Sequence, residues 1–198
     1  MSNIVFHQEP RNGQKIVMAA LAQLHLQDAS ARSLLQTSTA SQLSAVSPVP
    51  VFVLNVDAAG RLNKDDIRPA GVRYQVLIKT RAVAQAYVET VHRFDGDVAV
   101  EHQMLQAGPF VDGFTNAIET AEAELNGDYS PVLLMVPEIH FQALGFLPQP
   151  SDAGVSDPRF LPVTPIPSGV ESKFYPLDDL LDALMPIVRE AIDSGNDY

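Results

Sequence analysis

Four side chains that could transfer protons or bind a metal fall in two pairs along this chain, Glu89 with His102 and Glu138 with His140. A carboxylate beside an imidazole can serve as general acid and base, and two such pairs together could hold a metal ion. Glu138 and His140 have the spacing that places two side chains on one face of a strand. Glu89 and His102 are predicted to face each other across a hairpin. These four residues are the catalytic candidates.

The hairpin belongs to the run Val72–Gln106, which predicts three antiparallel strands. Asp95-Gly96 separates two β-rich segments and favours a two-residue turn, because both central residues must accept a positive φ. With this loop, Glu89 lies opposite His102. Residues 82–93 also fit a helical period, so a helix is the alternative there. We interpret them as a strand because their β-branched residues cluster next to the turn.

The segment Asn55–Asp66 partly matches a calcium-binding loop. Such loops need an oxygen ligand at the fifth position and a bidentate acid at the twelfth. Here Ala59 and Asp66 stand at those positions, so we interpret the segment as a polar turn with Gly60 at positive φ. No phosphate-binding loop, dinucleotide-binding glycine motif or nucleophile elbow occurs in the sequence. We therefore predict neither a metal site nor a cofactor.

Other elements follow from apolar spacing and from prolines. Helices are predicted at 14–27, from 28 to about 36, at 113–125 after the cap Asp112, and at 177–193, where Pro186 should kink or split the helix. Pro48 and Pro50 are expected to end the N-terminal helical region. Strands are predicted at 51–56, 131–137 and 138–144. Residues 148–176 contain seven prolines and predict an irregular segment.

This order of elements predicts a single α+β domain over residues 1–198. We expect a mostly antiparallel sheet of about five or six strands, flanked by helices at the N-terminus, in the middle and at the C-terminus. A doubly wound α/β fold is the alternative, but it requires a more regular alternation of strands and helices.

The composition and charge of the sequence exclude several classes of functional site and partner. The absence of cysteine excludes disulfides, thiol nucleophiles and cysteine-ligated metals. The net charge is −11, with 8 acidic and 10 basic residues in 1–100 but 16 and 3 in 101–198. Nucleic acid is disfavoured as a partner, because phosphate binding requires clustered positive charge. No apolar run is long enough to span a membrane and no secretory signal pattern is present, so we expect a soluble cytoplasmic protein.

The leading functional hypothesis is a non-enzymatic binding or interaction protein that self-associates, because the N-terminal helices carry few charges and no catalytic motif is present. The acidic second half either pairs with the basic residues of 61–93 or forms a face for a basic protein partner. One alternative is a hydrolase or metal-dependent enzyme that uses Glu89, His102, Glu138 and His140. Another is a small-molecule binding module with its pocket between the sheet and the Pro-rich segment.

Overall fold

The computed structural model describes residues 3–27, 40–78, 81–93, 96–106, 108–149 and 157–194. The α-helices of the described part are α1 (Gly13–Gln27), α3 (Pro109–Glu124) and α4 (Leu177–Asp193). The strands are β1 (Asn3–Ile4), β2 (Leu43–Val53), β3 (Arg68–Ile78), β4 (Arg81–Arg93), β5 (Gly96–Gln106), β6 (Asp128–Val136), β7 (Phe141–Pro148) and β8 (Arg159–Pro162). Short 3₁₀ turns are η1 (Ala40–Gln42), η2 (Lys64–Asp66) and η3 (Pro137–Ile139).

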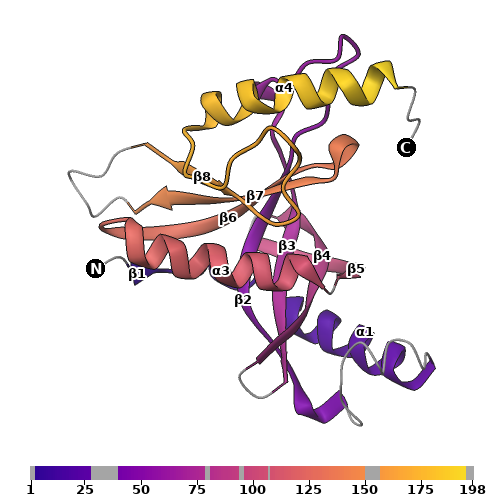
Figure 1. Ribbon diagram of the computed structural model, residues 1–198. Helices are drawn as coiled ribbons and strands as arrows, with labels where there is room; N and C mark the ends of the chain where they lie inside the picture. Colours follow the sequence, from indigo (N-terminus) through magenta and orange to yellow (C-terminus); the bar gives the residue numbers. More distant parts are fainter. Residues whose placement is uncertain are drawn as a thin grey trace. The chain divides into compact units, whose positions relative to one another are not determined.

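The strands are hydrogen-bonded in the order β5-β4-β3-β2-β6-β7-β8, with β1 also paired to β6 (Figure 1). The pairs β3–β4, β4–β5, β6–β7 and β7–β8 are antiparallel, whereas β6 is parallel to both β1 and β2. The predicted α+β class is therefore confirmed, with helices near the N-terminus, in the middle and near the C-terminus. The sheet has more strands than the expected five or six, and the two additional strands are β1 and β8. β8 was missed because it lies inside the segment predicted to be irregular, and β1 was missed because it covers only two residues.

The chain divides into two compact units, each built from separate segments. Unit 1 comprises residues 1–5, 51–69 and 113–198, and unit 2 comprises residues 6–50 and 70–112. The single domain predicted over 1–198 stays a prediction.

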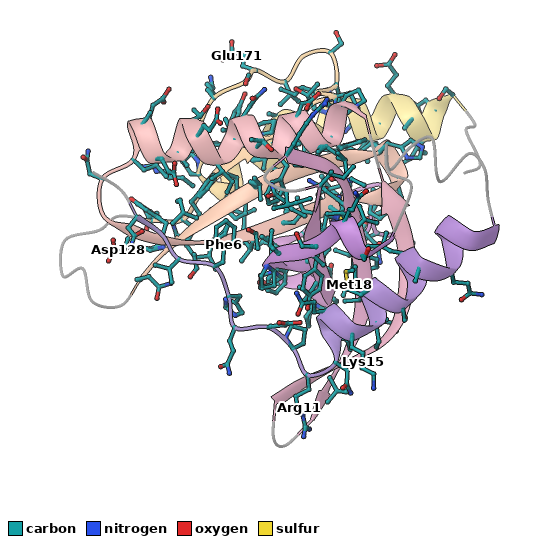
Figure 2. The ribbon with its side chains drawn as sticks, turned by 90° about the horizontal axis from the view of Figure 1, so that it is seen from below. Phe6, Arg11, Lys15, Met18, Asp128 and Glu171 are labelled. Atoms are coloured by element: carbon teal, nitrogen blue, oxygen red, sulfur yellow. The ribbon has the colours of Figure 1, made fainter. Side chains whose placement is uncertain are left out.

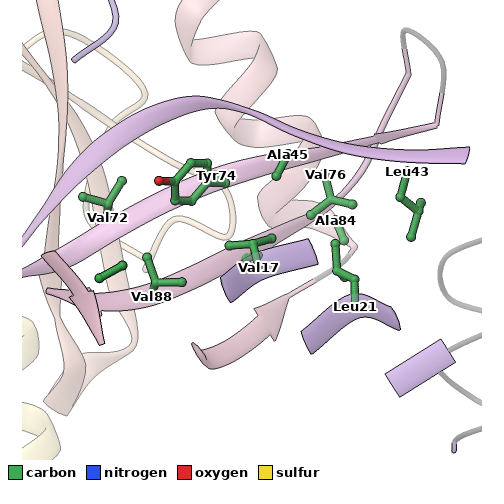
Figure 3. Close-up of a cluster of buried hydrophobic side chains, with 11 residues drawn as sticks. Val17, Leu21, Leu43, Ala45, Val72, Tyr74, Val76, Ala84 and Val88 are labelled. Atoms are coloured by element: carbon green, nitrogen blue, oxygen red, sulfur yellow. The ribbon is translucent and has the colours of Figure 1, made fainter. Parts of the chain in front are cut away.

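The core of unit 2 lies between α1 and the strands β3 and β4. Val17 and Leu21 are fully buried on the inner side of the helix and face Val76, Ala84 and Val88 (Figure 3). Alternate residues from Val72 to Val76 in β3 and from Ala84 to Val88 in β4 contribute to this core, as expected from the alternation of side chains along a strand. Residues 82–93 thus lie in a strand, as we interpreted, and not in a helix.

The start of α1 is held against Tyr74 of β3. Gly13 has no side chain, and a Cβ at this position would overlap the Tyr74 hydroxyl. The Glu9 carboxylate accepts a hydrogen bond from the Gln14 amide at 2.6 Å, which satisfies one free N–H of the helix. Burial raises the pKa of Tyr74, and the nearby Glu9 carboxylate raises this pKa further. Figure 2 shows Lys15 and Met18 in the following turn, with Met18 packed against the core.

The core of unit 1 lies between the inner side of α4 and the strands β6 and β7. Leu180 and Leu184 are fully buried there, in one cluster with Leu134 and Phe141. The Pro-rich segment adds to this core rather than projecting from it. Phe160 of β8 exchanges two backbone hydrogen bonds with Tyr175, so the outer edge of β8 is covered at this point.

The prolines of β2 and α4 do not interrupt these elements as predicted. Pro48 and Pro50 were expected to separate a helical region from a strand, yet both lie inside β2, which begins at Leu43. The ladder between β2 and β6 starts at Val51, so neither proline has to donate to it. α4 continues through Pro186, so the proline does not split the helix, whereas the predicted kink stays a prediction. The second helix, predicted from residue 28 to about residue 36, lies outside the described residues.

Candidate functional site

The structure does not place Glu89 opposite His102. Glu89 pairs with Glu101, and His102 pairs with Val88, so Glu89 and His102 lie on opposite faces of the hairpin. The cause is irregular pairing between β4 and β5, where the register shifts between Tyr87 and Val88 and again after Glu89. Such bulges insert an extra residue and reverse the facing of the strand beyond it. The predicted cross-strand Glu–His pair is therefore wrong.

The tip of the hairpin also differs from the prediction. Arg93 pairs with Gly96, so the connecting residues are 94 and 95 rather than Asp95-Gly96. The connection itself lies outside the described residues. Near the base of the hairpin, Tyr87 pairs with Met104, which is the register that the predicted loop implies.

Glu138 and His140 do not share a strand face. Glu138 lies in η3, and His140 ends this turn in a left-handed conformation with φ 50° and ψ 32°. The strand β7 begins only at Phe141. Glu138 and His140 belong to unit 1, whereas Glu89 and His102 belong to unit 2. Among the described residues, no group of three or more His, Asp or Glu side chains is arranged to hold a metal ion. The catalytic role of these four residues stays a prediction.

A different part of unit 1 forms concave surface. The connection between β2 and β3 lies beside α4 (Figure 1), and two adjoining hollows of about 520 and 710 Å³ open between them. We call this surface the α4 groove. Its first hollow is lined by Asp57, Arg61, Leu62, Asn63, Lys64, Asp178, Leu181 and Asp182. Its second hollow is lined by Val56, Asp57, Ala58, Ala59, Gly60, Arg61, Arg189, Ile192 and Asp193.

Asp57 organises the turn between the two hollows. Its Oδ1 accepts hydrogen bonds from the amides of Ala59 and Arg61 at 2.8 and 2.9 Å. Its Oδ2 accepts from the Arg61 guanidinium at 3.1 and 3.2 Å. The Arg61 amide is the largest cause that lowers the pKa of Asp57. Asp57 thus holds the turn, and Gly60 has the predicted positive φ, at 72°.

Two contacts join this turn to α4. Lys64 Nζ lies 3.0 Å from Asp178 Oδ1, in an exposed ion pair at the first hollow. The hydrogen bond from Lys64 to Asp178 raises the pKa of Lys64. At the second hollow, a Cβ on Gly60 would lie 2.8 Å from Ile192 Cδ1. Because Gly60 has no side chain, the Ile192 side chain can lie against the backbone of the turn at this position.

Glu138 binds the backbone of a residue that lines the groove. Its Oε1 accepts a hydrogen bond from the Val56 amide at 3.0 Å, and Val56 lines the second hollow. Its Oε2 is buried and has no hydrogen-bond partner among the described residues. Glu138, one of the four catalytic candidates, thus contacts a residue that lines the groove.

The acidic charge of the chain is concentrated in the unit that carries this groove. Counted over the full sequence, the segments of unit 1 hold 17 acidic and 6 basic residues, a net charge of −11. The segments of unit 2 hold 7 of each and are neutral. Lys64–Asp178 is one ion pair between the basic region 61–93 and the acidic second half. This one ion pair neutralises little of the negative charge of unit 1.

Sequence reasoning missed most of the groove. Apolar spacing in the predicted helix 177–193 places Ile192 on the same side as Leu184 and Val188, yet its exposed fraction is 53%. A signal for the turn did exist, because Asn55–Asp66 already indicated a polar turn at Gly60. The pairing of this turn with α4 joins residues more than a hundred positions apart, as in Lys64–Asp178, and no local pattern indicates it.

Comparison with protein-family models, with curated proteins and with solved structures finds no match to this chain. None of the helices in the described part is long and apolar enough to cross a membrane.

Proposed function

We propose that this chain is a non-enzymatic interaction protein that binds a protein partner along the α4 groove. The observation that carries the proposal is the exposed Ile192 beside two adjoining hollows. Besides Ile192, Val5 is the other large hydrophobic side chain exposed among the described residues, at 40%. An exposed apolar side chain in a concave, charge-rimmed surface is typical of protein-binding sites.

Charge supports a basic partner. The unit that bears the groove holds the whole net charge of −11. Such a field attracts a basic protein over a distance of about 8–10 Å at physiological ionic strength and speeds association. A partner with a positive surface would approach this unit in preference to the neutral one.

Affinity capture with a matched pair of variants tests this proposal. Ile192→Ser and Val5→Ser each remove one exposed apolar side chain, the first inside the groove and the second outside it. We expect the same partner to be captured by the wild-type chain and by Val5→Ser, and to be lost with Ile192→Ser. If both variants capture it equally, the groove is not the binding surface.

Self-association is the second candidate function, and its proposed interface is the outer side of α1 in unit 2. The sequence of α1 contains one formally charged residue, Lys15. Gln14, Lys15, Ala19 and Gln23 are exposed on this helix, so its outer side is poor in charge. Native mass spectrometry of the wild-type chain and of Ala19→Glu tests this interface. We expect a multiple of the chain mass for the former and a smaller species for the latter. A monomeric wild-type chain removes this candidate.

A further inference from the structure

We infer that the α4 groove takes an extended peptide segment of the partner, carrying basic residues around an apolar one. This inference rests on the proposed function and specifies the partner. The length of the groove is the first argument. Its α4 residues run from Asp178 to Asp193, which at 1.5 Å per residue is roughly 22 Å. An extended chain covers that distance with about seven residues.

The second hollow provides the apolar contact. Ile192 faces a turn made of the small residues Ala58, Ala59 and Gly60. The exposed fraction of Ile192 is 53%. A partner side chain such as Leu can therefore lie on Ile192 and over the turn. Burial of apolar surface on both sides favours this contact.

The charges around the groove indicate which residues flank that apolar side chain. Asp57 and Asp178 are already engaged by Arg61 and Lys64. Asp182 and Asp193 are exposed, and among the described residues neither has an ion pair. They lie eleven residues apart on α4, or roughly 16 Å. Two basic side chains about five residues apart on an extended segment match this distance.

Arg189 places a positive charge between these two carboxylates. The central part of the bound segment should therefore be apolar or neutral rather than basic. Across its whole length α4 carries five acidic residues and one arginine. The helix as a whole thus favours a basic segment, with the local exception at Arg189.

Fluorescence anisotropy with three labelled synthetic peptides tests the inference. The first peptide has a Leu between two Lys residues on a Ser background. The second replaces Lys by Glu, and the third replaces Leu by Ser. We expect the first peptide to bind the wild-type chain, and to bind less tightly as salt is added, because exposed charges are screened. The second and third peptides should bind at least about tenfold more weakly.

Three protein variants locate the binding. Ile192→Ser removes one apolar contact, and the double variant Asp182→Asn/Asp193→Asn removes two charged contacts. Each variant should weaken binding of the first peptide about tenfold, which corresponds to about 1.4 kcal/mol. Val5→Ser should leave it unchanged. All altered side chains are exposed, so the variants should keep the thermal stability of the wild-type chain, which a melting curve verifies.

The outcomes separate this inference from the proposed function. Binding of the Glu peptide in place of the Lys peptide would overturn the basic partner but leave the groove as the binding surface. Equal weakening by Ile192→Ser and Val5→Ser would place the peptide elsewhere and overturn the inference. If no peptide binds while Ile192→Ser still abolishes partner capture, the partner does not bind through an extended segment, and the proposed function stands.

Discussion

Asp57 shows how one carboxylate can fix the shape of a surface. It accepts from two backbone amides and from the guanidinium of Arg61. Asp57 lies in the segment Asn55–Asp66, whose sequence partly matches a calcium-binding loop. The structure shows that its carboxylate oxygens hold the chain's own turn.

The pH dependence of stability tests this role of Asp57. Its pKa is lowered from 3.8 on folding, so the ionised form is favoured in the folded chain. Stability from this group is fully present above pH 3.8 and is lost as the pH falls through the lowered pKa. We expect the difference in melting temperature between the wild-type chain and Asp57→Asn to shrink below pH 3.8. A difference in melting temperature between the two chains that stays constant from pH 7 to pH 3 would contradict this role.

Arg73 is a cation inside unit 2. Its exposed fraction is 2%, and its Nη1 donates to Gln85 Oε1 at 3.1 Å. Burial lowers the pKa of Arg73 to about 10. Gln85 in turn lies 3.5 Å from the Phe110 carbonyl, at the limit of a hydrogen bond.

Arg73→Ala should lower the free energy of unfolding by about 3 kcal/mol, because it leaves a cavity and removes the hydrogen bond to Gln85. Arg73→Met, which fills most of the space without a charge, should lose less. Urea denaturation measures both changes. Equal losses for the two variants would mean that packing contributes little at this position.

At the scale of single residues, the sequence could predict positions whose chemistry is local. The positive φ of Gly60 follows from its place in a polar turn. The facing of Glu89 and His102 could not be predicted, because it depends on two bulges between β4 and β5. No residue type in those strands specifies such bulges, and each one reverses which side chains share a face.

The contact between the β2–β3 connection and α4 depends on glycine. Gly60 and Gly169 both have positive φ, at 72° and 92°. A Cβ would lie 2.8 Å from Ile192 at the first position and would have nothing within 4 Å at the second. Ala at either position should cost about 1–2 kcal/mol from backbone strain.

Gly60→Ala should therefore destabilise the chain more than Gly169→Ala does. It should also weaken partner capture, because the new methyl group displaces Ile192. The measurements are thermal unfolding and the capture assay of the two variants. If both variants behave alike, the position of Ile192 does not depend on Gly60.

The hydrogen bond from Val56 to Glu138 should determine how firmly the same connection is held. Glu138→Ala should accelerate hydrogen exchange of the Val56 amide about tenfold or more, because a bond to a charged acceptor is lost. The global stability should change less, since the variant also removes the buried, unpartnered Oε2. Glu138→Gln keeps an acceptor oxygen and should retain most of the protection. Unchanged exchange in Glu138→Ala would refute this anchoring role.

At the scale of elements, prediction succeeded where apolar periodicity decides the structure. This is true of α1 and α4 and of the strands that form the cores. α3 was also predicted, but it begins at Pro109, so the predicted cap Asp112 lies inside its first turn. Prediction failed at β2, where Pro48 and Pro50 suggested an interruption. Proline is excluded only where its missing N–H is needed. Which edge of β2 is paired depends on tertiary neighbours, so the local sequence could not predict that the strand begins at Leu43.

At the scale of the whole molecule, the excess of acidic residues could be predicted from the sequence. Which segments of the chain share that excess in the folded molecule could not be predicted. Dividing the chain at residue 100 gives a basic and an acidic half. The units instead interleave, because residues 51–69 belong with 113–198. The sheet order brings β6 beside β2, although three strands and a helix separate them in sequence. Long-range pairing of this kind leaves no local pattern.

The pairing of β1 with β6 has a further consequence. β1 binds the start of β6 and β2 binds its end, so that Pro131, which has no N–H to donate, falls between the two paired stretches. Asn3 and Val5 donate to the carbonyls of Gly127 and Tyr129, and Ser130 donates to Val5. Deleting residues 1–5 would leave these groups as an open template for a strand of another molecule. We expect the shortened chain to polymerise as its concentration rises, which light scattering would detect, and an added peptide with the sequence of residues 1–5 to cap the template and slow that growth.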